Sequence, residues 1–576
     1  MTPSPSARLD PRIRPREWND PAPVPSDLDP LHDHKLLHAL LYRRGLRTRS
    51  EAAAFLDADW RQALDPGQLP DFGRAVERIA AAVRNGERIG IFGDYDVDGT
   101  TSVAILGLAL RAAGAGERMH IRLPHRSEGY GLSGSAIDEF SEAGVQLLVA
   151  LDCGSSNHGE VAYARALGMD VVVVDHHQMR DHGPEGTIVV SAYRPDGGPL
   201  RDLSAAGLTW LIVDGLFGTG LPVSSDDSGA DAYLDLAALG LIGDVSAMTG
   251  ASRSLTRAGL ASLAQRPRPG IAALARTANV DLGRIGAVDI SYRITPRLNA
   301  AGRMADPSLA LDLLLAPNPA VAQQLVLELE QLNSQRKLVT DEITHAAEQM
   351  IRRQAAWESQ PVVLVRSEGW QTGVVGIVAA RLAEAYDRPA VVLVEEGGVL
   401  RGSMRAPDGF DVVQALNACS PLLRTYGGHR SAGGLSLDVA QADAFIEQLG
   451  ELAAGRPPAA APVLQLDAEL QEKHLNLEIA RLVRSLEPFG PGNEEPVFVL
   501  RNTRLQNYDV MGQSKQHLSL TIGNGRSVRA PFFNAAARSR ELVGARTIDV
   551  AFTLGESDWN GPRLDMYVRD FRVPSQ

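Results

Sequence analysis

The alternation of hydrophobic and polar positions divides the chain into blocks of different character. Between about residues 70 and 250, apolar runs at 88–92, 146–151 and 170–174 alternate with alanine-rich segments of helical period. Runs that stay apolar throughout are typical of parallel strands buried on both faces, which the intervening helices cover. This block therefore predicts an α/β domain with a parallel sheet.

A long amphipathic segment follows between residues 318 and 355. Its apolar side chains recur every three or four positions among Gln, Glu, Lys and Arg, which predicts a single helix. At about 1.5 Å per residue such a helix spans ~50 Å, enough to join two domains across a cleft. A second α/β block is expected at 359–455, and the Gly- and Pro-rich run at 455–462 is typical of a linker.

The pattern turns to short strands after residue 463. Segments of high β propensity are separated by turn sequences such as Gly-Asn-Gly at 523–525. A compact block of this kind predicts a small barrel of the oligonucleotide-binding (OB) type, and an immunoglobulin-like sandwich is the alternative. The expected strands are 497–500, 517–522, 528–533, 548–554 and 564–568.

The N-terminal segment is different again. It is rich in Pro, Asp and Arg, and eight prolines before residue 31 interrupt any regular element. We expect an irregular arm that wraps the first domain. The sequence thus predicts an α/β multidomain protein with an arm at 1–69, a parallel-sheet domain at 70–307, a connecting helix at 308–358, a second α/β domain at 359–455 and a barrel at 463–576.

The composition narrows the class of protein. With 576 residues, 44% hydrophobic and 22% charged, the chain matches a globular protein and not a disordered or collagen-like one. Cys153 and Cys419 cannot form a disulfide framework, and the sequence has no signal-like segment or membrane-length apolar run, so we expect a cytoplasmic protein. The net charge of −13 argues against a surface that coats a polyanion as a whole. Any nucleic-acid site must therefore be local.

Acidic residues and a histidine pair mark the ends of the predicted strands of the first domain. They are Asp94, Asp96 and Asp98 after the first strand, Asp152 after the second, Asp175, His176 and His177 after the third, and Asp244 after a helical segment at 234–242. Taken singly, each of them is most often a turn residue, a helix cap or a satisfied polar group. Their number at successive strand ends is what calls for another explanation.

Convergence of these residues points to bound cations. Ligand sites of open α/β sheets lie outside the carboxyl ends of the strands, where so many carboxylates repel one another unless cations lie among them. Carboxylate oxygens with an imidazole nitrogen suit Mn²⁺ or Mg²⁺, and the sequence has no Cys-x-x-Cys pair for a thiolate zinc site. Two such ions clamp the attacking and leaving oxygens in phosphoryl transfer. The chemistry favours hydrolysis of a phosphoester or phosphoanhydride.

The motifs and their order resemble a known group of enzymes, the DHH phosphoesterase superfamily. The matching motifs are Asp-Tyr-Asp-Val-Asp-Gly at 94–99, Leu-Asp-Cys-Gly at 151–154, Asp-His-His at 175–177 and Gly-Asp at 243–244. Further segments at 124–131, 294–304 and 427–434 are similar to the RecJ family of bacterial single-strand-specific 5′–3′ exonucleases. The resemblance implies a DHH catalytic domain, a DHHA1-type substrate-binding domain and a terminal OB-fold domain.

The resemblance also implies roles for individual residues. The implied metal ligands are Asp96, Asp98, Asp152, His176 and Asp244, with Asp152 bridging two ions of Mn²⁺ or Mg²⁺. Asp94 and Asp175 are implied to support catalysis from behind the ligands, and His177 to hydrogen-bond the scissile phosphate or protonate the leaving oxygen. Phe92 stands where some relatives carry a histidine ligand, so one metal site is expected to be weak.

For the substrate, the resemblance implies that the DHHA1-type domain faces the metals across a groove. The residues implied to hold the strand are Ser403, Arg405 and His429, and those implied to grip its 5′ end or stack a base are Arg126, Tyr130 and Arg303. The segment 293–303 carries three arginines and no acid, which favours phosphate contact.

The terminal block at 463–576 is electrically neutral, with 14 basic and 14 acidic residues, so the rest of the chain carries the whole net charge. Its basic and aromatic residues suit backbone contact and base stacking on single strands. They are equally consistent with charges at strand edges beside core phenylalanines. The residues concerned are Arg526, Arg529, Phe532, Phe533, Arg538 and Arg540.

These features together predict a metal-dependent exonuclease that threads single-stranded DNA between the two α/β domains and releases 5′-mononucleotides in recombination and repair. The alternatives are a DHH-family phosphodiesterase for short RNA or cyclic dinucleotides, an inorganic pyrophosphatase, and a non-catalytic DNA-binding replication scaffold. The long helix and the barrel argue against a small diffusible substrate, and the retained ligands argue against a scaffold. We expect a monomer, and the resemblance suggests single-strand-binding protein and a RecQ-type helicase as partners.

Overall fold

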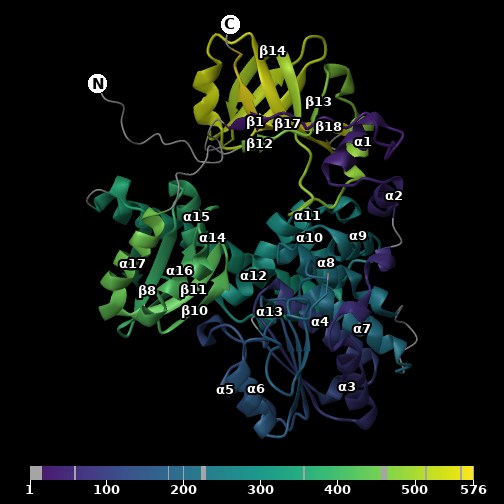
Figure 1. Cartoon of the computed structure of the whole chain (residues 1–576), viewed down its shortest axis with the longest axis vertical. Coiled ribbons are helices and arrows are strands. Elements are labelled where there is room, and N and C mark those ends of the chain that lie inside the picture. Colours follow the sequence, from purple (N-terminus) through teal and green to yellow (C-terminus); the bar gives the residue numbers. More distant parts are fainter. Residues whose placement is uncertain are drawn as a thin grey trace. The chain divides into compact units, whose positions relative to one another are not determined.

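The structure is a computed structural model of the chain (Figure 1). It describes residues 16–57, 60–179, 181–198, 200–221, 229–354, 357–455, 463–512, 515–557 and 561–574. Contacts divide the chain into two compact units. One unit comprises residues 57–337 and 487–494, and the other comprises 1–56, 338–486 and 495–576.

The first of these units is built on a five-stranded parallel sheet. The strand order is β3 (Met119–Arg122), β2 (Ile89–Gly93), β4 (Leu147–Leu151), β5 (Asp170–Val174) and β6 (Ile188–Val190). The strands expected from the three apolar runs are confirmed as β2, β4 and β5. Because these three are adjacent and parallel, their carboxyl ends open on the same edge of the sheet.

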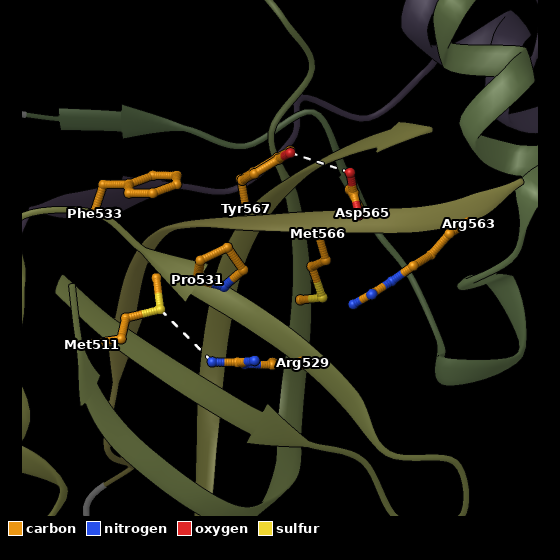
Figure 2. Close-up of a pocket in the computed structure, with 8 residues that line it drawn as sticks. All are labelled: Met511, Arg529, Pro531, Phe533, Arg563, Asp565, Met566 and Tyr567. Atoms are coloured by element: carbon orange, nitrogen blue, oxygen red, sulfur yellow. Dashed lines mark hydrogen bonds between the residues drawn. The ribbon is translucent and has the colours of Figure 1, made fainter. Parts of the chain in front are cut away.

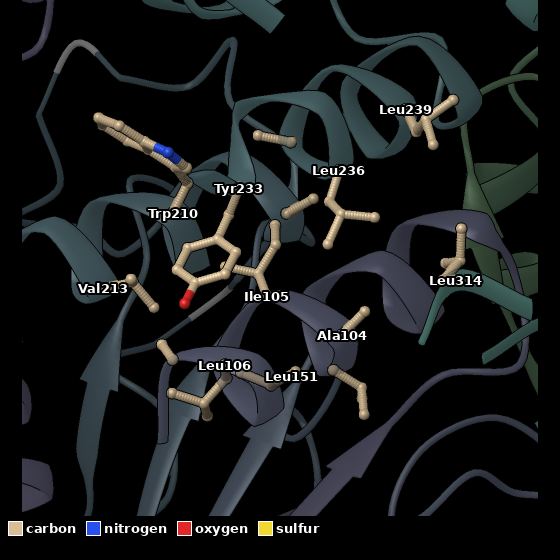
Figure 3. Packing of buried hydrophobic residues seen from close by; sticks show 14 of the residues in the cluster. Ala104, Ile105, Leu106, Leu151, Trp210, Val213, Tyr233, Leu236, Leu239 and Leu314 are labelled. Atoms are coloured by element: carbon tan, nitrogen blue, oxygen red, sulfur yellow. The ribbon is translucent and has the colours of Figure 1, made fainter. Parts of the chain in front are cut away.

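Helices α4 (Val97–Ala112) and α7 (Ala205–Gly218) cover one face of this sheet, and α8 (Leu234–Gly243) packs on these two helices. Figure 3 shows Ile105 of α4, Trp210 of α7 and Leu236 of α8 converging in one apolar core, with Leu151 of β4 in the same cluster. Nearly every residue of α8 is buried, as expected for a helix that is apolar all round. The core thereby fixes where α8 ends, directly before Asp244.

The opposite face of the sheet carries α5 (Gly134–Glu142) and α6 (His158–Ala166) (Figure 1). Side chains alternate between the two faces along each strand. Ile91 belongs to the core under α4, whereas Phe92 packs with Phe140 of α5 in the second core and is fully buried.

The rest of this unit is helical. Its remaining helices are α3 (Phe72–Asn85), α9 (Gly250–Gln265), α10 (Pro269–Thr277), α11 (Ala287–Asp289), α12 (Thr295–Met304) and α13 (Ser308–Leu314). The long α14 (Pro319–Arg353) confirms the single helix expected at 318–355. Its residues up to 337 group with this unit and those from 338 with the other.

The second α/β block forms a five-stranded sheet of its own, as the sequence predicts. The order is β10 (Thr425–His429), β11 (Ala432–Asp438), β9 (Val399–Arg405), β8 (Ala390–Glu396) and β7 (Val363–Glu368), with only β7 and β8 parallel. Its helices are α15 (Thr372–Tyr386), α16 (Val412–Ala418) and α17 (Ala442–Ala454).

The terminal strands form one antiparallel sheet, in the order β16 (Val528–Phe532), β15 (His517–Ile522), β14 (Phe498–Met511), β17 (Thr547–Ser557) and β18 (Arg563–Arg572). The two outer strands, β16 and β18, lie against one another, so the sheet curls into a barrel. This confirms the barrel expected from the sequence and rules out the two-sheet sandwich. The remaining elements are β12 (Val463–Gln465), β13 (Ala468–Glu469) and α18 (Leu477–Arg484).

The expectation of an irregular arm around the first domain is wrong for the described part of the N-terminal segment. Helices α1 (Lys35–Arg43) and α2 (Arg49–Asp57) form where the prolines end, and α1 buries Leu37, Leu40 and Leu41 at helical spacing. The strand β1 (Glu17–Asn19) pairs in parallel with β12. The segment therefore joins the unit that contains the barrel.

The linker expected at 455–462 lies outside the described residues apart from its first residue. Among the helices that the structure describes, none combines the length and the apolar content that crossing a membrane requires.

Candidate metal centre and nucleic-acid-binding residues

The strand ends of the parallel sheet bring most of the sequence-predicted residues into one cluster. Three sets of potential ligand atoms each lie within 4.8 Å of one another. The sets are Asp152 with His176 and His177, Asp98 with His176 and Asp244, and Asp94 with Asp96 and Asp152. Because Asp152 and His176 each belong to two sets, the three sets form a continuous cluster that is able to hold more than one ion.

The turn between β2 and α4 positions three of these carboxylates. Asp96 is the N-cap of α4, and its Oδ1 accepts hydrogen bonds from the N–H groups of Asp98 at 2.9 Å and Gly99 at 3.2 Å. Glycine is needed at position 99, because a Cβ there would lie 2.5 Å from the backbone nitrogen of Asp94. The tight turn keeps Asp94 and Asp96 close together.

Asp98 ties the turn to a second helix. Its buried carboxylate accepts hydrogen bonds from Ser204 Oγ at 2.6 Å and from the N–H groups of Ala205 at 2.8 Å and Ala206 at 3.0 Å, at the start of α7. A carboxylate offers about four lone-pair sites, and Asp98 Oδ2 also lies 3.7 Å from His176 Nε2. Asp98 therefore caps α7 and faces the cluster at the same time.

Asp152 lies at the centre of the cluster. It is buried and has a left-handed backbone with φ 62°, a conformation that a non-glycine residue adopts at a cost and most often at functional sites. Oδ1 of Asp152 and Oδ1 of Asp94 are buried with no hydrogen bond of acceptable geometry, although His176 Nε2 lies 3.2 Å from the former. Leaving carboxylate oxygens in this state is costly, and a cation would remove the cost.

His177 is held by a carboxylate. Its Nδ1 lies 2.8 Å from Asp175 Oδ1, and Asp175 also accepts a hydrogen bond from the N–H of Ser155 at 3.2 Å. The hydroxyl of Tyr130 donates to the backbone oxygen of Asp152 at 2.7 Å and lies 2.9 Å from His177 Nδ1. Tyr130, which the resemblance places at the 5′ end of a substrate, is thus in contact with His177.

The carboxylates of the cluster are destabilised in their charged form. Burial and the adjacent Asp96 raise the pKa of Asp94 to about 8, and burial raises the pKa of Asp244 to about 7. Burial together with the charges of Asp98 and Asp96 raises the pKa of Asp152 well above its ordinary value. Repulsion among buried acids is the effect that bound cations reverse.

The histidines respond in the opposite sense. Burial lowers the pKa of His177, but Asp175 outweighs burial and raises it to about 9. The same contact outweighs burial at Asp175 and holds the pKa of that carboxyl below its ordinary value. Asp244 and Asp98 raise the pKa of His176 against its burial. The cluster thus combines carboxylate oxygens with imidazole nitrogens, and it contains buried oxygens without hydrogen bonds and carboxyl groups with raised pKa values. This combination fits hard divalent cations such as Mn²⁺ or Mg²⁺.

Metal binding should therefore become more stabilising as the pH rises. The pKa values of Asp94 and Asp244 are raised from 3.8, and that of His177 from 6.5, so the folded protein holds extra protons and its free energy of unfolding falls as pH rises through these windows. Mn²⁺ displaces the protons of the carboxyl groups.

At a hundredfold excess over Kd, Mn²⁺ should add about 2.7 kcal/mol to the free energy of unfolding. At one fixed Mn²⁺ concentration, the Tm gain over chelator, measured by thermal unfolding, should be larger at about pH 8 than at about pH 6, because Kd falls as the carboxyl groups lose their protons. Equal gains at the two pH values would contradict the electrostatic argument.

The structure refines the sequence-predicted division between ligands and supporting residues. Asp94, expected behind the ligands, lies within ligand distance of Asp96 and Asp152, whereas Asp175 is in none of the three sets and contacts His177. Phe92 is buried in the core beneath the cluster, so that position offers no ligand.

Some residues that support the cluster carry no signal in the sequence. Asn299 of α12 accepts the N–H of Val97, the first residue of α4, at 3.0 Å across 202 residues of chain. Ser204 and Ser155 likewise reach aspartates that are remote in sequence. Only the folded structure brings these pairs together, because no local pattern links their members.

A cationic cluster lies beside the turn after β2. The guanidinium of Arg126 lies 4.1 Å from the ring centroid of Tyr95, and its Nε donates to the backbone oxygen of Gly302 at 3.3 Å. Burial and the nearby charges of Arg126 and Arg336 lower the pKa of Arg303. Guanidinium groups that lie close together repel one another, and an anion such as phosphate bound among them would relieve this repulsion.

Arg336 of α14 is absent from the sequence-based interpretation. Two of its nitrogens lie 3.3 and 2.8 Å from Oδ1 of Asn333, which is fully buried. The sequence does indicate a polar contact here. Asn333 lies four positions after the buried Leu329 and interrupts the apolar stripe of the helix with a polar side chain.

The second α/β block places its three predicted substrate residues on one face of a sheet. Arg405 of β9 pairs with Ala432 of β11, which pairs with His429 of β10, and Ser403 lies two positions before Arg405. The residue between Arg405 and His429 is the small Ala432. Helix α15 packs on the same face, and its Gly376 allows this close approach, because a Cβ there would lie 3.0 Å from the Arg405 guanidinium and 3.2 Å from Ser403 Oγ.

The basic and aromatic residues of the barrel divide into two groups. Arg538 is fully buried and ion-paired with Asp570, and Phe532 is buried as well, so for these two the core interpretation is correct. Phe533 is 53% exposed. Arg526 and Arg540 are exposed too.

Figure 2 shows a pocket of about 260 Å³ on the barrel surface. The ring of Phe533 stacks on Tyr567 at its wall, with centroids 6.2 Å apart and planes 25° apart. Arg529 and Arg563 supply positive charge and Asp565 the negative charge. A ring platform between arginines is the combination that binds a nucleobase and its phosphate. The lining residues are Met511, Arg529, Pro531, Phe533, Arg563, Asp565, Met566 and Tyr567.

Three models of known families match the chain. The DHH family, N-terminal domain, matches residues 88–241, the DHHA1 domain matches 359–455 and the RecJ OB domain matches 466–570.

Whole-length relatives and solved structures match as well. The single-stranded-DNA-specific exonuclease RecJ of Thermus thermophilus is 36% identical over 93% of this chain and 75% of its own length. The protein of that name from Escherichia coli is 32% identical over 96% and 97%. Crystal structures of RecJ from Thermus thermophilus match with a TM-score of 0.81 for the Mn²⁺ complex (29% identity, 97% of this chain and 80% of that chain) and 0.75 for the Mg²⁺ complex (28%, 97% and 79%).

Proposed function

Since the chain belongs to the RecJ family, we propose that it is a single-stranded-DNA-specific exonuclease that hydrolyses phosphodiester bonds from the 5′ end and needs Mn²⁺ or Mg²⁺. One observation carries the proposal. Buried carboxylate oxygens without hydrogen-bond partners converge with His176 at one edge of a parallel sheet, beside a second histidine that a carboxylate holds. The expected products are 5′-mononucleotides.

The cluster supplies enough donors for two ions. We assign the ligands as Asp96, Asp98, Asp152, His176 and Asp244, with Asp94 in place of the ligand that Phe92 cannot supply. Divalent cations bound there would neutralise charge on the phosphoryl group and lower the pKa of a water molecule. The protein supports the ligands by the capping bonds of Asp96 and Asp98 to helices α4 and α7.

His177 is suited to act on the scissile phosphate. Asp175 engages Nδ1 and raises the pKa of the ring above its ordinary value, which favours the charged form. The charged ring can therefore donate a hydrogen bond to a phosphoryl oxygen or a proton to the leaving 3′ oxygen at neutral pH. Tyr130 limits the ring's rotation through its contact at Nδ1.

The arginines beside Tyr95 are proposed to grip the 5′-terminal phosphate. Hydrogen bonds to charged groups are worth about 1.5–3 kcal/mol, so Arg303→Gln should raise KM for a 5′-phosphorylated strand at least about tenfold with kcat little changed. The discrimination between 5′-phosphate and 5′-hydroxyl ends should shrink by the same factor, measured by initial rates on both substrates. The exposed Arg111→Gln, in the last turn of α4, is the matched control. An equal loss on both kinds of end would contradict the assignment.

The DHHA1-type domain is proposed to hold the strand's backbone. Ser403, Arg405 and His429 share one sheet face, where the exposed His429 and the small Ala432 leave room for a phosphate to approach. Their charge and hydrogen-bonding capacity suit phosphate oxygens and read no base edge, which agrees with cleavage that does not depend on sequence.

The barrel pocket is proposed to stack a base of the strand downstream of the cleavage site. Base–aromatic stacking is worth about 1–3 kcal/mol per base, so Phe533→Ala should weaken binding of a long single strand at least about fivefold, measured by fluorescence anisotropy. Val543→Ala removes another exposed apolar side chain of the same barrel and serves as control. Unchanged affinity in Phe533→Ala would remove this pocket from the binding surface.

The decisive experiment for the function follows degradation of 5′-labelled and 3′-labelled single strands in Mn²⁺. We expect the 5′ label to appear at once as a mononucleotide, the 3′ label to pass through shortening intermediates, and duplex DNA to resist. Fast hydrolysis of cyclic dinucleotides or pyrophosphate, with long strands left intact, would replace the proposal with a small-substrate phosphodiesterase or pyrophosphatase. Binding without cleavage would indicate a scaffold.

The proposal places the protein in DNA recombination and repair. An enzyme that accepts only single strands needs another activity to unwind duplex DNA, and a protein that keeps the strand extended would assist it. We propose a RecQ-type helicase and single-strand-binding protein in these two roles, with the enzyme acting as a monomer.

A further inference from the structure

Residues 487–494 form a loop that belongs by its contacts to the catalytic unit. The segments on both sides of it, 338–486 and 495–576, group with the other unit. Asn493 within the loop is 2% exposed, whereas Pro491 and Gly492 are exposed, so the loop is packed on one side and faces solvent on the other. A short segment that directly precedes the barrel strands in the sequence is thus part of the compact unit that holds the metal centre.

The loop has a fixed internal geometry. Gly490 and Asn493 exchange backbone hydrogen bonds of 3.0 Å in both directions. The side-chain amide of Asn493 donates to the backbone oxygen of Pro488 at 2.8 Å, and the N–H of Gly492 donates to Glu494 Oε1 at 3.1 Å. These mutual hydrogen bonds, together with the buried Asn493, make the loop rigid.

This rigid loop grips the segment that joins α8 to α9. The N–H of Met248 donates to the backbone oxygen of Pro491 at 2.7 Å, and Arg253 Nη2 donates to the backbone oxygen of Glu487 at 3.0 Å. The fit is close, because a Cβ on Gly490 would lie 2.6 Å from Met248 Cγ. The joining segment is therefore fixed by the loop at its far end.

The near end of that segment carries Asp244, which is the C-cap of α8. The next residue, Val245, has a left-handed backbone with φ 61°, a true outlier for a β-branched residue. Ser246 Oγ donates to Asp244 Oδ2 at 3.2 Å. Such strain persists only where the surroundings over-determine it, and here α8 holds one end and the loop the other.

We propose that the 487–494 loop is a latch that positions the carboxylate of Asp244 for metal binding, with Asn493 and Gly490 as positioning residues. The inference rests on the proposed function, because it takes Asp244 as a metal ligand. Groups that orient a ligand without touching the metal typically change metal affinity by about 10–100-fold. In this way a segment that directly precedes the barrel strands in the sequence supports the metal site.

The test measures Mn²⁺ binding directly, by calorimetry and by the electron paramagnetic resonance signal of free Mn²⁺, on the full-length protein. Asn493→Ala should weaken Mn²⁺ binding about 10–100-fold, and saturating Mn²⁺ should restore kcat. The exposed Asn507→Ala, in the barrel, is the matched control and should bind Mn²⁺ as the wild type does. Loss of folding stability alone would lower Tm in chelator but leave the Mn²⁺ affinity of the folded protein unchanged, and that result would overturn the latch.

A second variant guards against a misfolded first one. Gly490→Ala presses on Met248 while keeping the amide of Asn493, and Gly73→Ala, where a Cβ meets nothing within 4 Å, is its control. We expect weakened Mn²⁺ binding for Gly490→Ala and unchanged binding for Gly73→Ala. Wild-type affinity in a folded Gly490→Ala or Asn493→Ala protein would contradict the proposal.

A double-mutant cycle separates the latch from the ligand assignment. Asp244→Asn should weaken Mn²⁺ binding by itself, and adding Asn493→Ala to it should cost little more, because the latch acts only through Asp244. If Asp244→Asn leaves Mn²⁺ binding intact, the ligand assignment fails. If Asp244→Asn weakens binding and the two effects simply add, the ligand stands and the latch fails.

Discussion

Replacing Asp152 by asparagine should reduce nuclease activity at least about a thousandfold, as expected when a central electrostatic group of a pre-organised site is removed. The potential ligand atoms of Asp152 lie within 4.8 Å of those of His176 and His177 in one set, and of those of Asp94 and Asp96 in another. An amide has the same shape but lacks the charge that holds a cation between them. Single-turnover cleavage of a 5′-labelled strand measures the loss.

The fold should survive this change. Burial and the neighbouring Asp98 and Asp96 raise the pKa of Asp152 well above its ordinary value, so the charged carboxylate is costly in the metal-free protein. A neutral amide avoids that cost, and Tm in chelator should stay level or rise. The Mn²⁺-dependent gain in Tm should disappear. The exposed Asp443→Asn, on α17, is the control for a neutralised carboxylate. Residual activity within about tenfold of wild type would remove Asp152 from the centre.

Replacing His177 by glutamine should lower kcat about 10²–10⁴-fold, the usual contribution of a positioned acid or base. Mn²⁺ affinity should fall far less than in Asp152→Asn, because the ring is engaged by Asp175. The contact raises the pKa of His177 above its ordinary value, so wild-type kcat should decline at alkaline pH as the ring loses its proton. Initial rates measured across the pH range record this decline in kcat.

Asp175→Asn provides the matched test of the same contact. Without the carboxylate, the pKa of His177 should fall toward its ordinary value, and the alkaline limb of the pH–rate profile should shift toward neutral pH. A profile that keeps its limb in Asp175→Asn, or a His177→Gln enzyme with wild-type kcat, would show that His177 does not carry the proton.

The sequence predicted the sheet and the convergence of acids and histidines at its edge because both follow from local rules. Strands buried on both faces read as continuous apolar runs, as in β4 and β5, and parallel strands end at a common edge. The strand pattern alone therefore places Asp152 and His176 at one edge of the sheet, although 24 residues of chain separate them.

Contacts between remote elements could not be predicted in this way. Asn299 reaches the start of α4 across 202 residues, and Arg336 joins Arg126 and Arg303 from the long helix. The buried helix α1 was hidden by the prolines that precede it. In the barrel, Arg538 belongs to the core because it forms a buried ion pair with Asp570. Composition does not show which strands bring such residues together.

The central claim is that the acids and histidine at this sheet edge form a metal-dependent centre for 5′ cleavage of single strands. Its most direct test titrates Mn²⁺ into chelator-treated protein while recording Mn²⁺ binding and mononucleotide release from a 5′-labelled strand on the same samples. The account predicts no release without the ion, release that rises with occupancy, and loss of both in Asp152→Asn. Full release in the presence of chelator, or unchanged Mn²⁺ binding in Asp152→Asn, would contradict it.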